Sequence, residues 1–128
     1  MKKNGPGSVV VISSENVFRP GDNQTWYSAS KAAVSVATKS MALEFAKDQL
    51  RFNTVNPTSG NTPLLSTFAG QAGAPVTAEI LKIKSAAIPI GRIAEPSDVA
   101  NAALFLADPA SSLISGAEIK VDGAHSVG

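Results

Sequence analysis

The chain has 128 residues with 11 basic and 10 acidic side chains, which is enough for one domain and leaves almost no net charge. This balance excludes the clustered basic surface of a nucleic-acid-binding protein. The sequence has no cysteine and a single histidine, which excludes disulfides, thiolate metal centres and His-rich zinc sites, so we expect no metal.

The start of the chain and its apolar runs indicate whether to expect a signal peptide or a membrane helix. A basic pair, Lys2-Lys3, stands near the start without a long apolar stretch behind it, so we expect no signal peptide. No apolar run approaches the roughly 20 residues that a membrane helix needs. We therefore expect a cytoplasmic protein with neither a membrane nor a nucleic acid as partner.

The first half of the chain predicts a strand, a long helix and a second strand. Residues 8–12 form a continuous β-branched run, which is typical of a strand buried on both faces. A loop over residues 17–25 leads to an Ala-rich stretch from about residue 27 to 48, which predicts a helix. Four apolar residues of that stretch fall at helical spacing: Val34, Ala37, Met41 and Phe45. Residues 51–56 predict the second strand, which Pro57 ends.

The second half predicts a long connection, two helices and a last strand. Residues 57–75 are rich in Gly and Pro, with a short helix around residues 64–68, and so long a connection is typical of a functional or mobile segment. Residues 77–87 predict a helix with Thr77 as its N-cap and with Ile80 and Ile83 facing inward. Pro96 begins the next helix, Pro109 bars its continuation, and residues 117–121 alternate as a strand.

This order of elements predicts an α/β fold. Strand, helix, strand, helices and strand alternate as in a parallel sheet of about three strands with flanking helices and right-handed crossovers. Ligands of open parallel sheets bind beyond the carboxyl ends of the strands. Ser14 and Pro57 follow two such ends, so we expect the functional cleft there.

Tyr27 and Lys31 are the first candidates for chemistry. They are four residues apart and share one face of a helix. A phenol has an ordinary pKa of about 10, too high for efficient acid/base work near neutral pH, but a nearby ammonium favours the phenolate. Ser14 stands 13 residues earlier, where its hydroxyl could bind the substrate oxygen that the phenol protonates. The alternatives are an ordinary surface pair and a serine that only caps the strand end.

A family resemblance adds to this interpretation. Ile12-Ser13-Ser14 is followed, 13 residues after Ser14, by Tyr27-Ser28-Ala29-Ser30-Lys31. This pair of segments resembles the active-site signature of the short-chain dehydrogenases/reductases. Residues 51–57, 61–64, 91–100 and 114–123 are similar to further segments of that family. Together the segments cover the chain from about residue 7 to 123.

The resemblance implies an oxidoreductase that transfers hydride between NAD or NADP and a small-molecule carbonyl or alcohol substrate. Tyr27 would be the general acid/base, Lys31 would assist it, and Ser14 would orient the substrate. The residues that would contact the cofactor are Tyr27, Lys31, Pro57, Gly60 and Thr62. Residues 60–75 would form a lid over the substrate.

The sequence also departs from the family pattern. The resemblance places the Gly-rich pyrophosphate turn, the Asn of the proton relay and the residue that selects NAD or NADP before Met1. We therefore expect residues 1–128 to form a single partial Rossmann-like domain, the catalytic and substrate-loop half of a doubly wound sheet. The cofactor-binding N-terminal half would be absent and the isolated chain impaired or inactive. Thr58 also stands where the family usually has Gly, and Gly60 where it usually has Val or Ile.

Two other functions stay open. A partial sheet leaves an unpaired edge strand, which invites association, so we expect a homo-oligomer. A truncated, non-catalytic oligomerisation or interaction module is therefore the alternative. A serine hydrolase built on Ser28-x-x-Lys31 lacks the Lys-Thr-Gly segment that such enzymes need. His125 is expected to be a solvated residue near the C-terminus.

Overall fold

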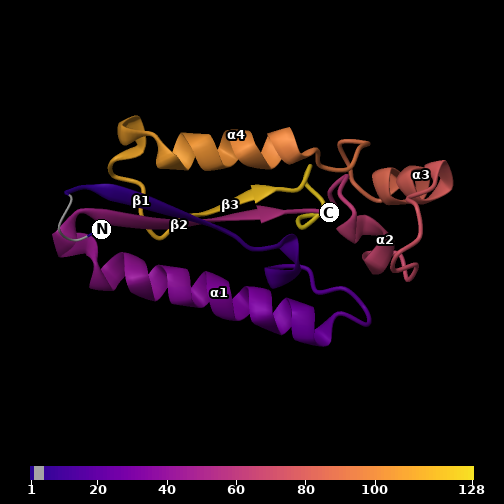
Figure 1. Ribbon diagram of the computed structural model, residues 1–128, viewed down its shortest axis with the longest axis horizontal. Helices are drawn as coiled ribbons and strands as arrows, with labels where there is room; N and C mark the ends of the chain where they lie inside the picture. The colour runs from indigo at the N-terminus through magenta and orange to yellow at the C-terminus, as the bar shows by residue number, and fades with distance from the viewer. Residues whose placement is uncertain (2–4) are drawn as a thin grey trace.

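The computed structural model describes residues 1 and 5–128 and shows three layers, with one parallel sheet between helices (Figure 1). The sheet has the order β1-β2-β3, with β1 at Gly7–Ile12, β2 at Leu50–Pro57 and β3 at Glu118–Val121. Helix α1 (Thr25–Glu44) covers one face and α4 (Pro96–Ala107) covers the other. The predicted α/β fold is confirmed. Lys2 and Lys3, the basic pair near the start, lie outside the described residues.

The three strands agree with the sequence prediction to within one residue at each end. β1 pairs with β2 in parallel from Gly7 opposite Leu50 to Ile12 opposite Val55. β2 continues past the end of β1 and pairs with β3 as far as Pro57 opposite Val121. In the described part of the chain, the outer edge of β1 pairs with no strand. The sheet therefore has the open edge that the sequence predicted.

The buried face of α1 consists of small side chains. The buried positions are Ser28, Ser35, Thr38 and Ala42, whereas Val34 and Ala37 are exposed. The hydroxyls can be buried because they are satisfied: Thr38 Oγ1 donates to the carbonyl of Val34 at 2.8 Å, and Ser35 Oγ to Ser13 Oγ at 3.2 Å. The helix also ends earlier than predicted, at Glu44, and a 3-10 turn follows at Ala46–Asp48.

Two short helices lie beyond the carboxyl ends of the strands (Figure 1). They are α2 (Leu64–Phe68), which matches the predicted short helix, and α3 (Ala78–Ala86). The Thr77 side chain accepts a hydrogen bond from the backbone N–H of Ile80, which confirms the predicted N-cap. Ile80 is buried in a cluster with Leu65, Ile88 and Ile93. Ile83 is 62% exposed, so its predicted inward position is wrong: α3 packs on this cluster through one side only.

Helix α4 begins at Pro96 as predicted, and a polar cap fixes its start. The Asp98 carboxylate accepts from the backbone N–H of Glu95 at 2.8 Å and from the Arg92 guanidinium at 2.5 and 2.9 Å. The hydrogen bond from Arg92, with that from Glu95, lowers the pKa of Asp98 to about 2. Further along the helix, Leu106 is fully buried against the sheet. The capped helix thus closes the second face of the sheet.

Candidate active site

A cavity of about 520 Å³ opens where β1 and β2 end and α1 begins, with α2 along its side. All the residues that the sequence singled out as a site line this one cavity: Ser14, Tyr27, Lys31, Pro57, Gly60 and Thr62. They come from four segments that meet at the carboxyl ends of parallel strands, as the fold argument requires. Segments along which the sequence predicted no site also contribute, among them those that carry Lys84 and His125.

Tyr27 and Lys31 lie one turn apart near the start of α1. The Lys31 ammonium lies 5.8 Å from the centre of the Tyr27 ring and donates to the carbonyl of Ile12 at 3.0 Å. The Tyr27 ring also meets the Phe68 ring edge-on, with 4.9 Å between centroids. The phenol ring is therefore in contact with an apolar side chain of α2 and has near it an ammonium tethered to β1.

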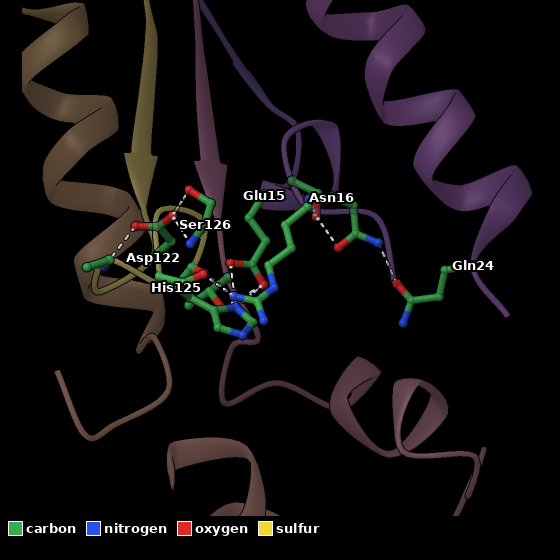
Figure 2. A network of polar contacts seen from close by, with 11 residues as sticks. Glu15, Asn16, Gln24, Asp122, His125 and Ser126 are labelled. Carbon is green, nitrogen blue, oxygen red and sulfur yellow. Dashed lines mark hydrogen bonds and ion pairs between the residues drawn. The ribbon is translucent and has the colours of Figure 1, made fainter. Parts of the chain in front are cut away.

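Ser14 both lines the cavity and caps a turn. It is buried, and its Oγ accepts a hydrogen bond from the backbone N–H of Asn16 at 3.2 Å as the N-cap of the 3-10 turn Glu15–Val17. The Asn16 amide in turn donates to Gln24 (Figure 2). It also donates to the Ser28 hydroxyl, which ties this turn to the start of α1. The capping alternative and the cavity position are thus both true of Ser14.

A buried carboxylate next to Ser14 joins the ends of all three strands. Glu15 is only 6% exposed, follows β1, and accepts a hydrogen bond from the Thr58 hydroxyl, just beyond β2, at 2.8 Å. Nδ1 of His125, beyond β3, lies 3.0 Å from each oxygen of the same carboxylate (Figure 2). The prediction that His125 is a solvated residue is therefore wrong, because this pairing leaves its side chain only 20% exposed.

The turn that carries His125 is held by Asp122. The Asp122 carboxylate accepts from the backbone N–H of Ala124 and from both the N–H and the hydroxyl of Ser126 (Figure 2). Burial opposes its ionisation, but these hydrogen bonds hold the pKa of Asp122 below its ordinary value. Arg19 adds a clamp from outside by donating to the carbonyl of His125 at 2.6 Å. Both the backbone and the side chain of His125 are thus fixed.

The cavity offers groups that fit the nicotinamide end of a dinucleotide. An ammonium and a hydroxyl, from Lys31 and Thr62, line it beside Tyr27 and suit ribose and phosphate oxygens. A Cβ on Gly60 would lie 3.6 Å from the carbonyl of Ala94, an ordinary contact, so packing does not demand glycine there. Thr58 stands where the family that the sequence resembles usually has Gly. Its hydroxyl donates to Glu15, so threonine adds a hydrogen bond that glycine cannot make.

Two further findings concern the rest of the described chain. Among residues 1 and 5–128, no three acidic or histidine side chains are grouped so as to hold a metal ion. In the same residues, no helix combines the length and the apolar character needed to cross a membrane.

Comparison with known proteins defines the class. A family model described as enoyl-(acyl carrier protein) reductase matches residues 1–125. The chain is 42% identical over 123 residues to 4-formylbenzenesulfonate dehydrogenase of Comamonas testosteroni. It is 39% identical over 126 residues to 2,5-dichloro-2,5-cyclohexadiene-1,4-diol dehydrogenase of Sphingobium indicum. The chain belongs to the short-chain dehydrogenase/reductase family.

The solved structures agree in fold and in extent. A 3-ketoacyl-(acyl-carrier-protein) reductase from Brucella melitensis, complexed with NADH, superposes with a TM-score of 0.86 at 36% identity. That match covers 98% of this chain and 48% of the reductase. The two curated relatives are covered over 48% and 47% of their length. The chain therefore spans about half the length of the relatives that it matches.

Proposed function

We propose that the chain supplies the catalytic and substrate-binding half of an oxidoreductase, which transfers hydride between NAD or NADP and a carbonyl or alcohol substrate. The observation that carries this proposal is that Tyr27, Lys31 and Ser14 line one cavity at the carboxyl ends of the sheet. Family membership supports it, as do the dehydrogenase names of the relatives and the NADH in the Brucella melitensis reductase.

Each of the three side chains has a separate task in this proposal. The Tyr27 hydroxyl gives a proton to the substrate oxygen in reduction and takes one back in oxidation. The Lys31 ammonium, 5.8 Å from the ring centre, stabilises negative charge on the phenol oxygen. Ser14 fixes the position of the substrate oxygen by a hydrogen bond. The nicotinamide supplies the hydride chemistry, and the chain supplies orientation and electrostatics.

The cofactor end of the cavity is assigned to the remaining predicted residues. Lys31 and Thr62 would hold the ribose and phosphate oxygens, beside the backbone of Pro57 and Gly60. Phe68, in edge contact with the Tyr27 ring, would keep water from the phenol on the lid side. We infer that residues 1–128 are one partial Rossmann-like domain, because they span about half of each relative.

An interaction module is the second candidate, and exposed apolar side chains favour it. Trp26, Val36 and Leu43 on α1 are 85%, 62% and 83% exposed, and the outer edge of β1 lacks a partner strand among the described residues. Val36 and Leu43 are seven residues apart, so they lie on the same side of the helix. These features support the proposal that the chain forms a homo-oligomer, which is compatible with catalysis.

The cofactor half of the proposal can be tested with the single tryptophan. Trp26 precedes Tyr27 in the first turn of α1, so energy transfer from its indole to a reduced nicotinamide bound in the cavity should lower its fluorescence when NADH or NADPH binds. Lys31→Met removes a charged hydrogen-bond donor, and a loss of about 1.5 kcal/mol should weaken affinity about tenfold. Lys47→Met, at an exposed position in the 3-10 turn that follows α1, is the matched control and should bind like the wild type.

The result that contradicts the proposal is equally clear. Wild-type protein whose Trp26 fluorescence does not change at millimolar nucleotide, after correction with free tryptophan, would have no nicotinamide site. Equal affinity of the Lys31→Met and Lys47→Met variants would show that nucleotide binds elsewhere on the chain.

A further inference from the structure

The Glu15–His125 pair is the part of the cavity that the proposed reaction does not use. Glu15 is the residue after Ser14, and its carboxylate is occupied by Thr58 and His125. Consecutive Cα atoms are about 3.8 Å apart, so the pair stands beside the serine that would bind the reacting oxygen. A buried carboxylate held by two side chains from other strand ends is a rigid support for an imidazole.

That support selects one tautomer of His125. A carboxylate only accepts hydrogen bonds, so the ring nitrogen next to it, Nδ1, carries the proton. In the neutral ring the other nitrogen, Nε2, then presents a lone pair. The same arrangement of carboxylate and imidazole holds the histidine of a Ser-His-Asp triad with its Nε2 ready to accept a proton.

The free nitrogen is available to a ligand. Figure 2 shows the Glu15 carboxylate directed at one side of the His125 ring, with the second ring nitrogen pointing away from it. Among the described residues, Nε2 has no hydrogen-bond partner, whereas Nδ1 has two contacts to Glu15. The ring lines the same cavity as Ser14 and Tyr27, so a molecule bound there can reach it.

We propose that His125 determines substrate specificity: its Nε2 accepts a hydrogen bond from a second hydroxyl group of the substrate, whose reacting oxygen lies at Ser14 and Tyr27. The substrate class is therefore a diol or a hydroxy-carbonyl compound small enough for a cavity of about 520 Å³. A substrate that lacks the second hydroxyl leaves this partly buried acceptor unpaired, so the protein binds that substrate more weakly. The assignment of the reacting oxygen rests on the proposed function, but the acceptor itself does not need hydride transfer.

The tautomer can be measured directly because His125 is the only histidine in the chain. Imidazole ¹⁵N resonances of the wild type, recorded on the neutral ring, should show a protonated Nδ1 and a bare Nε2. Glu15→Gln replaces the carboxylate by an amide that can also donate, so this variant should show a mixture of tautomers. A wild-type ring protonated at Nε2 would overturn the proposal.

Ligand titration tests the specificity. cis-Cyclohexane-1,4-diol should shift the Nε2 resonance and bind about tenfold more tightly than cyclohexanol, which corresponds to one hydrogen bond. His125→Phe should abolish the preference for the diol, His125→Gln should keep part of it through the amide oxygen, and the exposed neighbour variant Val127→Ala should leave it unchanged. Equal binding of diol and cyclohexanol to the wild type would overturn the proposal. So would a shift caused by cyclohexanecarboxylate and not by the diol, because that ring would bind anions.

The outcomes separate this proposal from the proposed function. Tyr27→Phe removes the proton donor but should leave the His125 tautomer and the diol preference intact. A chain that binds the diol through His125 but binds no nucleotide would refute the oxidoreductase proposal alone. Nucleotide binding without a diol preference would refute the role of His125 alone.

Discussion

Replacing Thr58 by valine removes one hydroxyl from the strand-end cluster while keeping the shape of the side chain. The Thr58 hydroxyl donates to Glu15 at 2.8 Å, and the two residues are 8% and 6% exposed, so water cannot easily replace the lost donor. A hydrogen bond to a buried carboxylate contributes about 1.5–3 kcal/mol. With a urea dependence of about 2 kcal/mol per molar for a small domain, a loss of about 2 kcal/mol lowers the unfolding midpoint by about 1 M.

Urea unfolding followed by far-ultraviolet circular dichroism measures this change. Thr67→Val on α2 is the matched control, because Thr67 is exposed and its hydroxyl makes no contact that would be lost. The control should shift the midpoint by less than about 0.25 M, since exposed substitutions change stability by no more than about 0.5 kcal/mol. If Thr58→Val were as stable as Thr67→Val, the cluster would not contribute to stability and the rigid support assigned to His125 would be wrong.

Two further predictions concern the pH dependence of stability and the surface. The folded pKa of Asp98, about 2, lies below its ordinary value of 3.8, so its contribution is present above about pH 4 and is lost as the pH falls toward 2. The difference in melting temperature between wild type and Asp98→Asn should therefore shrink over that interval, and a constant difference would contradict the Arg92 pairing. In light scattering the wild type should be an oligomer that Leu43→Glu on α1 dissociates. The variant Ile83→Glu, which replaces another exposed apolar side chain on α3, should not dissociate it. A monomeric wild type would exclude the interaction surface.

The regular elements could be predicted because their signals are local. The β-branched run before Ser13, the proline at position 96 and the threonine at position 77 each specify a strand or a helix start within a few residues. The face of α1 could not be predicted in the same way. The helical spacing of its apolar residues does not indicate which side chains are buried, because the hydroxyls of Ser35 and Thr38 find partners that only the folded chain supplies.

The site residues also differ in whether local sequence patterns predict them. Tyr27 and Lys31 are one helical turn apart, and Ser14 follows a strand, so their meeting in one cavity follows from local spacing and the rule for parallel sheets. His125 is 110 residues away from Glu15 along the chain, and no local pattern indicates that they pair. The clue that the sequence did hold was an acidic residue directly after Ser14, just beyond the end of a strand.

The small side chains under α1 have a consequence for the catalytic geometry. Since Ser35 and Thr38 set how closely the helix approaches the sheet, they also set the height of Tyr27 above the strand ends, about two to three turns away. A bulkier residue at either position would move α1 away from the sheet and move the phenol with it. For the proposed reaction a displacement of about 1 Å can reduce the rate about a hundredfold. Side chains that never meet a ligand would then govern how fast the proton moves.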